Sequence, residues 1–271
     1  HISGNKYRKL KYNLLQAKAE GYSSLLTYGG AYSNHIAATA YAGKLAELQT
    51  IGVIRGQELK NTWQQNPTLN FAHQNGMQFE FVTRSQYRDK PTLEFKERLV
   101  AKYGTYYELP EGGTNALAVK GCEEILTKAD TKFDVVCTCV GTGGTLAALI
   151  NTSGAHQEVL GFQILHGDYL TADIRNFTKK ANWRLITDHH FGGYAKVSAD
   201  LIRFINDFKA KTKIQLDPIY TGKLFYGLLA MIENEQFEAG TNILAIHTGG
   251  LQGILGMNRV LKKKNLPLID I

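Results

Sequence analysis

The chain has 271 residues, of which 44% are hydrophobic and 20% charged, so it can bury a core and is not a disordered protein. It contains no run of eighteen apolar residues, which excludes a membrane-spanning helix. The net charge of +7 comes from residues that are scattered apart from short basic runs at 6–11 and 262–264, and we see no face on which basic residues and aromatics interleave, which argues against nucleic-acid binding. Three cysteines argue against a disulfide framework, so we expect a cytoplasmic protein. Because the chain opens at His1 without a methionine, we expect it to be processed or truncated.

Apolar, β-prone runs alternate with helix-like segments along the whole chain. We predict strands at residues 24–28, 49–55, 79–84, 105–109, 134–140, 159–164 and 242–248. We predict helices at residues 7–20, 34–48, 62–75, 91–102, 115–128, 145–151, 198–209, 222–234 and 251–262. Gly21, Gly76 and Gly104 stand where a glycine closes a helix. This alternation predicts parallel sheets with right-handed crossovers, in which ligands gather at the carboxyl ends of the strands.

Glycine pairs stand at these strand ends. The chain has 27 glycines, and ten of them form the pairs 29–30, 112–113, 143–144, 192–193 and 249–250. Three of the pairs follow apolar runs and precede helix-like segments, which is the strand–turn–helix unit of an α/β fold.

The turn that follows residues 134–140 suits a phosphate. Its backbone N–H groups at Gly141, Gly143 and Gly144, with the hydroxyls of Thr142 and Thr145, would form an anion cradle at a helix start. It is neither a Walker A loop nor a dinucleotide fingerprint, because no Gly-Lys-Ser/Thr follows and no third glycine is present. The alternative is a merely structural turn.

A second turn of the same type, residues 29–35, suits a carboxylate. Ser33 or Asn34 can cap the helix that follows, and capping alone would explain them. The same geometry leaves hydroxyl, amide and N–H donors for an anion. A phosphate site together with a carboxylate site describes a cofactor and an amino or keto acid.

Lys6 lies at a predicted helix start, directly after the Gly4 turn. The positive end of the helix dipole favours the neutral amine, which a Schiff-base lysine requires. Lys9 lies three residues on, on the same helix face, and could reach a phosphate. By spacing alone, Lys6 is one of many lysines and more often a surface residue than a catalytic one.

Five motifs occur in order: Ser-Gly-Asn-Lys-x-Arg-Lys-Leu at 3–10, Ser33-Asn34, the 141–145 loop, Asp-Pro-Ile-Tyr-Thr-Gly-Lys at 217–223, and His-Thr-Gly-Gly at 247–250. Together they resemble the family of 1-aminocyclopropane-1-carboxylate (ACC) deaminases and D-cysteine desulfhydrases. These are fold-type II enzymes that depend on pyridoxal phosphate (PLP), akin to the tryptophan synthase β subunit. The resemblance covers essentially the whole chain, and such relatives carry a few tens of residues before the first motif.

The resemblance implies a role for each site residue. Lys6 would bond covalently to PLP and move protons, and either it or Tyr220 would remove the α-proton of the substrate. Asn34 would contact the ring hydroxyl, and Ser33 and Asn34, with the adjacent His35, would bind the substrate. The residues implied for the phosphate are Lys9, Gly141, Thr142, Gly143, Gly144 and Thr145, and those implied for the substrate side are Tyr194 and Tyr220.

Two threonines bear on the choice of substrate. ACC deaminases carry Glu and Leu where this chain has Thr221 and Thr248, and the threonine pattern resembles D-cysteine desulfhydrases. A neutral hydroxyl leaves the PLP ring nitrogen unprotonated, a milder electron sink that suffices when a good β-leaving group departs. We therefore expect elimination from D-cysteine to pyruvate, sulfide and ammonia. The alternatives are ACC ring opening to 2-oxobutanoate and ammonia, an inactive PLP-binding protein, and a phosphate-ester enzyme without PLP.

We expect two αβα domains with mostly parallel sheets and PLP in the cleft between them. The smaller domain would span residues 9–111, and the larger would comprise residues 1–8 and 112–271. The resemblance implies a homodimer. No metal site is expected, because residues 188–190 lack a second set of spaced ligands and Cys137 and Cys139 lie on one face of a strand.

Overall fold

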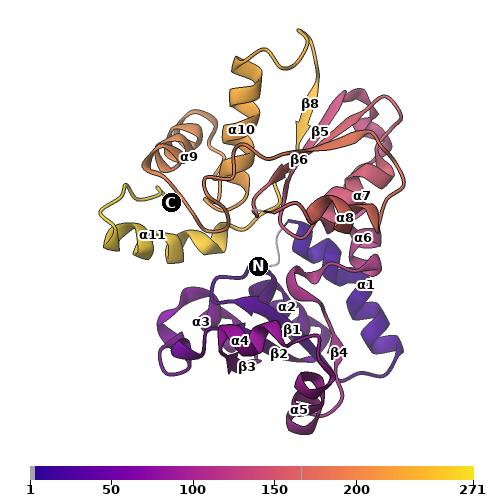
Figure 1. The fold of residues 1–271 in the computed structure, drawn as a ribbon, viewed down its shortest axis with the longest axis vertical. Helices are drawn as coiled ribbons and strands as arrows, with labels where there is room; N and C mark the ends of the chain where they lie inside the picture. The colour runs from indigo at the N-terminus through magenta and orange to yellow at the C-terminus, as the bar shows by residue number, and fades with distance from the viewer. Residues whose placement is uncertain (1–3, 166) are drawn as a thin grey trace. The chain divides into compact units, whose positions relative to one another are not determined.

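A computed structural model describes residues 4–165 and 167–271 of the chain. The chain forms two compact units, one ending at Asn115 and the other running from Ala116 to Ile271 (Figure 1).

The first unit contains a four-stranded parallel sheet. Its order is β3-β2-β1-β4, with β1 spanning Ser24–Gly30, β2 Gln49–Arg55, β3 Met77–Val82 and β4 Tyr107–Glu108. The register pairs Leu26 with Ile51 and with Glu108. All but the last residue of β1 are buried, as expected of a parallel strand covered on both faces.

Helices cover both faces of this sheet. They are α1 (Asn5–Ala19), α2 (Asn34–Ala46), α3 (Pro67–Gln74), α4 (Arg84–Arg88) and α5 (Leu93–Tyr103). On one face Leu25 of β1 packs with Leu10 of α1 and Ala38 of α2, and on the other Leu26 packs with Phe95 of α5. Side chains cap several starts: Asn66 accepts from two amides of α3, Thr83 forms a capping box with α4, and Thr92 caps α5.

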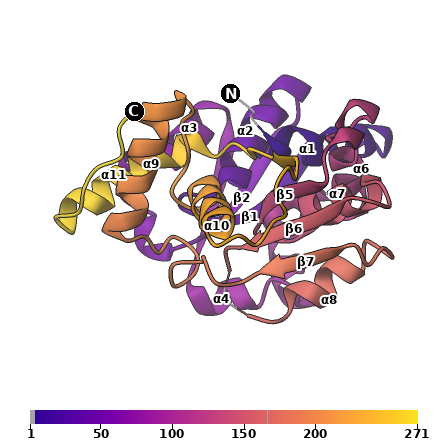
Figure 2. The ribbon, with the colours of Figure 1, turned by 90° about the horizontal axis from the view of Figure 1, so that it is seen from above.

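The second unit repeats this architecture (Figure 2). Its parallel sheet has the order β7-β6-β5-β8, with β5 spanning Val135–Val140, β6 Glu158–Gln163, β7 Trp183–Ile186 and β8 Ile243–Ala245. One face packs against α6 (Ala116–Cys122), α7 (Gly144–Thr152) and α8 (Leu170–Arg175). The other packs against α9 (Ala199–Thr212), α10 (Thr221–Glu233) and α11 (Ile254–Lys263). Short 3₁₀ helices occur at Gln57–Leu59, Trp63–Gln65, Glu111–Gly113, Lys128–Lys132 and Leu251–Gly253.

The α/β class with parallel sheets is confirmed. Gly21, Gly76 and Gly104 have φ of 76°, 88° and 75°, positive values that favour glycine where each helix ends. Apart from the 3₁₀ helices, three short elements, α4, α8 and β7, lie where none was predicted, and the predicted helix 115–128 ends at Cys122. No helix among the described residues is long and apolar enough to cross a membrane.

The observed units differ from the predicted domains at the start of the chain. The predicted larger domain includes residues 1–8, of which 1–3 lie outside the described residues. In the structure α1 runs without a break from Asn5 to Ala19, across the predicted boundary between residues 8 and 9, and the whole helix belongs to the first unit. The boundary between the units falls at Asn115, four residues beyond the predicted one.

Candidate active site

Lys6 and Lys9 converge on one backbone carbonyl of the first unit. Lys6 lies in the first turn of α1, after Gly4 with φ of 61°; Ser3 of the same motif lies outside the described residues. The Nζ atoms of Lys6 and Lys9 each donate to the Gly112 carbonyl oxygen over 3.2 Å. Lys9, which is 2% exposed, also donates to Thr114 Oγ1 over 2.8 Å. The predicted lysine pair therefore shares one acceptor, which the sequence motif did not reveal.

The turn that offers this carbonyl depends on two glycines. Gly112 and Gly113 have φ of 68° and 70°, the region that favours glycine. A Cβ at Gly113 would stand 2.6 Å from Cε1 of the His35 ring. Asn115, just after the turn, donates to Asn13 Oδ1 of α1 over 2.7 Å. Together these contacts fix the turn beside the two lysines.

His35 is a neutral, buried residue behind this turn. The Thr27 hydroxyl donates to the Leu109 carbonyl over 3.1 Å, so it accepts from His35 Nε2 at 2.9 Å. Burial holds the pKa of His35 well below its ordinary value, and the charges of Lys6 and Lys9 lower it further. The ring is 2% exposed, and its Nδ1 has no hydrogen-bond partner among the described residues. The structure thus places His35 beneath the lysine turn, where it presents almost no surface to a substrate.

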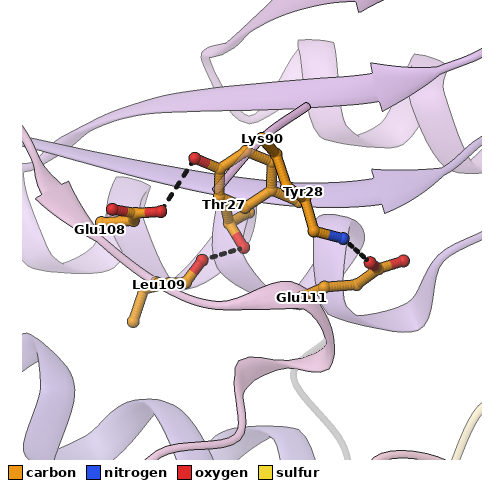
Figure 3. Close-up of polar contacts among 6 residues, drawn as sticks. All are labelled: Thr27, Tyr28, Lys90, Glu108, Leu109 and Glu111. Carbon is orange, nitrogen blue, oxygen red and sulfur yellow. Dashed lines mark hydrogen bonds and ion pairs between the residues drawn. The ribbon is translucent and has the colours of Figure 1, made fainter. Parts of the chain in front are cut away.

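A second set of polar side chains anchors the residues before the turn (Figure 3). The Tyr28 hydroxyl donates to Glu108 Oε1 over 2.9 Å, and Lys96 pairs with the other oxygen of Glu108 at 2.8 Å. Lys90 pairs with Glu111 in the turn itself. Burial, followed by the charge of Glu108, raises the pKa of Tyr28, so its hydroxyl remains a donor. These pairs join residues far apart in the sequence and have no local sequence signal.

Ser33 and Asn34 stand at the start of α2. Ser33 is the N-cap, and its Oγ accepts from the Ile36 amide at 3.3 Å, as the capping interpretation predicts. No acceptor for its hydroxyl hydrogen is found among the described residues, so Ser33 could donate it to an anion. Gly29 lets the turn close, because a Cβ there would stand 2.6 Å from Ile36 Cγ1. Both side chains are partly exposed at the positive end of the helix dipole, which suits a carboxylate.

The glycine-rich loop of the second unit follows β5. Gly143, which has no side chain, occupies the N-cap of α7 with φ of 80°, so this residue supplies no side-chain cap to the first amides of the helix. A Cβ at Gly143 would stand 2.7 Å from Cγ1 of Ile174, and Thr145 is buried in the first turn. Gly141 lies against the Tyr220 ring, where a Cβ would be 3.3 Å from Cε1. Loop and tyrosine, predicted from distant motifs, therefore meet.

Tyr194 and Tyr220 form an edge-to-face pair. Their ring centroids are 6.2 Å apart with an interplanar angle of 66°. Burial raises the pKa of Tyr220 well above its ordinary value, and the neighbouring Tyr194 and Asp217 add to this shift. Tyr220 is thus a proton donor at neutral pH, while Tyr194 is 38% exposed. The pairing brings two of the predicted substrate residues together.

Thr221 and Thr248 have different surroundings. The Thr221 hydroxyl donates to Asp217 Oδ1 over 2.8 Å and accepts from the Asp217 amide at 2.8 Å, so both its bonding directions are used within the turn. Thr248 is 8% exposed, and its hydroxyl lies 3.0 Å from Cys139 Sγ at the end of β5. Of the two, Thr248 is better suited to contact a cofactor ring.

The cysteines are buried side chains of the core. Cys137 and Cys139 lie in the same hydrophobic cluster, and burial raises the pKa of Cys137 to about 12. No cluster of three metal-binding side chains occurs among the described residues.

Fold and loops together define a class: an α/β protein with parallel sheets, a turn that bonds two lysines and a glycine-rich loop at a helix start. The chain belongs to the family of pyridoxal-phosphate dependent enzymes, which matches residues 1–249. PLP is therefore the cofactor, and the predicted cofactor and enzyme class are confirmed.

Several relatives carry names that narrow this class. A Pyrococcus horikoshii protein, provisionally named an ACC deaminase, is 32% identical over 93% of this chain and 81% of its own length. The Arabidopsis thaliana mitochondrial "bifunctional D-cysteine desulfhydrase/1-aminocyclopropane-1-carboxylate deaminase" is 29% identical over 93% of this chain and 70% of its own. The crystal structure of an ACC deaminase homologue matches with a TM-score of 0.81 at 30% identity, covering 96% of this chain and 84% of its own. The predicted resemblance is confirmed.

The described residues fit PLP. In the second unit, the start of α7 has a glycine as its N-cap, packed too closely on Ile174 to admit a side chain, and such a helix start suits a phosphate. Lys6 and Lys9 hold their amines on one carbonyl, one lysine partly exposed and the other buried.

Proposed function

We propose that this enzyme eliminates the β-substituent of a small amino acid, and that D-cysteine is its substrate. D-Cysteine and water would give pyruvate, hydrogen sulfide and ammonia. The observation that carries this choice is Thr221, a neutral side chain bonded within its own turn where the ACC deaminase pattern has a glutamate that would protonate the ring nitrogen. Thr248, buried beside Cys139, also differs from that pattern, which has leucine there. The Arabidopsis relative, whose name includes D-cysteine desulfhydrase, supports the choice.

Residues from several motifs would hold PLP, each by a different part of the cofactor. Lys6 would bond to it covalently, while Lys9 and the 141–145 loop would bind its phosphate through an ammonium group and helix amides. Asn34 would contact the ring hydroxyl, and Thr248 would contact the ring nitrogen. Bound PLP supplies an electron sink for the charge that develops on the substrate's α-carbon.

The substrate is oriented by its carboxylate. Ser33 donates its hydroxyl hydrogen to that carboxylate at the positive end of α2, with the Asn34 amide beside it. Fixing the carboxylate directs the α-hydrogen toward one base, which lowers the entropic part of the barrier.

Lys6 is the base in this proposal. Its amine takes the α-proton of the substrate. When the amine is not bonded to PLP, it donates a hydrogen bond to the Gly112 carbonyl oxygen. Tyr220, with its raised pKa, is a poor base but a good donor, so it protonates or hydrogen-bonds the departing sulfur. Tyr194 lies against it and shields the substrate side.

ACC deamination is the second candidate, favoured by the ACC deaminase homologue structure and the Pyrococcus relative. A homodimer and a cytoplasmic location belong to the same proposal, and light scattering of the purified holoenzyme tests the dimer.

A substrate panel tests the function. The holoenzyme is given D-cysteine, L-cysteine, D-serine or ACC, and the keto acid released is identified, with Lys6→Ala as the inactive control. We expect pyruvate from D-cysteine at the highest kcat/KM. Release of 2-oxobutanoate from ACC with no reaction of D-cysteine would favour the second candidate. A yellow protein that converts none of the four would indicate an inactive PLP-binding protein.

A further inference from the structure

Lys223 is a fully buried lysine that the proposed mechanism does not use. It lies in the first turn of α10 with 0% exposure, although lysines are seldom fully buried without a partner. Its Nζ donates to the carbonyl oxygens of His190 and Gly193, each over 2.8 Å. The positive end of a helix dipole is an unfavourable place for an ammonium group. Lys223 therefore contributes something other than helix stability.

The two carbonyls belong to the loop that carries Tyr194. Within it, Phe191, Gly192, Gly193 and Ala195 all have positive φ, between 54° and 107°. Non-glycine residues in this region are strained, so the loop needs contacts that maintain its shape. Lys223 bonds to this loop at His190 and at Gly193, and Gly193 directly precedes Tyr194.

Asp217 connects this lysine with the second tyrosine. It is 1% exposed, and its carboxylate accepts from the amides of Tyr220 and Thr221, at 3.0 and 2.8 Å. Its charge raises the pKa of Lys223, whereas burial has the larger effect and lowers it to about 8. Thus Asp217 fixes the backbone of Tyr220, and Lys223 fixes the loop of Tyr194.

We propose that Lys223 is a positioning residue whose buried Nζ, through the His190 and Gly193 carbonyls, holds Tyr194 against Tyr220 on the substrate side. Its effect on turnover rests on the proposed function, because it requires both tyrosines to face the substrate. Its effect on the loop does not.

A double-mutant cycle tests the effect on turnover. Lys223→Met, Tyr194→Ala and the double variant are compared as holoenzymes, with PLP content measured for each, because alanine removes the ring that Lys223 would position. Lys213→Met is the matched control, since the exposed Lys213 also donates to a carbonyl, that of Ala210 at 2.9 Å. We expect Lys223→Met to lower kcat/KM tenfold or more with unchanged PLP content, and to change it less than twofold in the Tyr194→Ala background. Independent, multiplicative losses would overturn the proposal.

Hydrogen exchange tests the effect on the loop without any substrate. If Lys223→Met fails to fold, Lys223→Arg takes its place, because arginine keeps a positive charge beside Asp217. We expect amides 191–195 to exchange at least tenfold faster than in the wild type, while those of β5 are unchanged. Unchanged exchange in the loop, or an equal rise in β5, would contradict positioning. If the loop exchanges faster in the Lys223 variant but the wild-type holoenzyme converts none of the four substrates, the proposed function is refuted and the positioning role remains.

Discussion

Replacing Gly113 with alanine tests the turn beneath Lys6. The backbone at Gly113 has φ of 70°, and an alanine there costs about 1–2 kcal/mol for the left-handed conformation. The new Cβ would also stand 2.6 Å from His35 Cε1 and 3.0 Å from Nδ1, and the ring cannot simply withdraw because Nε2 is bonded to Thr27. Overpacking of this kind costs about 1–3 kcal/mol more. We expect Gly113→Ala to lower the free energy of unfolding by about 2–5 kcal/mol in total.

Gly21→Ala is the matched control. Its φ is 76°, and no atom lies within 4 Å of the added Cβ, so it should lose only the conformational cost of about 1–2 kcal/mol. Urea unfolding of the two variants gives the difference directly. His35→Ala should restore part of the loss in Gly113→Ala but none in Gly21→Ala. Equal destabilisation of the two glycine variants would refute the contact between Gly113 and His35.

Three further predictions concern the loops and the buried lysine. Gly143→Ala brings a Cβ to 2.7 Å from Ile174, so we expect PLP affinity, titrated into the apo-protein, to fall at least tenfold; unchanged affinity would argue against a phosphate there. Ser33→Ala removes the α2 cap and should cost about 1 kcal/mol of stability while raising KM more than it lowers kcat. The pKa of Lys223 is about 8 in the folded protein and has its ordinary value of 10.5 in the unfolded chain, so between pH 8 and 10.5 folding releases a proton from this lysine. Stability relative to Lys223→Met should therefore rise from pH 8 to 10.5, by at most about 3 kcal/mol after solvent screening; a fall over that range would contradict the shift.

The sequence predicted the elements with strong local signals. The apolar run of β1 and the Ser33 cap of α2 placed both elements to within two residues at their N-terminal ends. By contrast, β7 is only four residues long, with Arg184 exposed in its middle, and neither its length nor its pattern distinguishes it from a loop. Tertiary pairing with β6 makes it a strand.

In the candidate site, too, local contacts could be predicted from the sequence and long-range contacts could not. The spacing of Lys6 and Lys9 predicted two lysines on one helix face, but their shared acceptor at Gly112 lies more than a hundred residues away. Lys223 and its loop partners are likewise about thirty residues apart. The bond between Thr221 and Asp217, by contrast, could be predicted from the sequence. An aspartate followed by proline, four residues before a threonine, is typical of a turn closed by side-chain hydrogen bonds.

Covalent attachment of PLP to Lys6 is the claim on which the proposed function depends. Reduction of the holoenzyme with borohydride, followed by proteolysis and mass spectrometry, locates the lysine that carries the pyridoxyl group. We predict the label on the peptide that contains Lys6, and its loss, together with the yellow colour, in Lys6→Ala. A label on Lys9 or Lys223, or no labelled lysine in a yellow protein, would contradict the account.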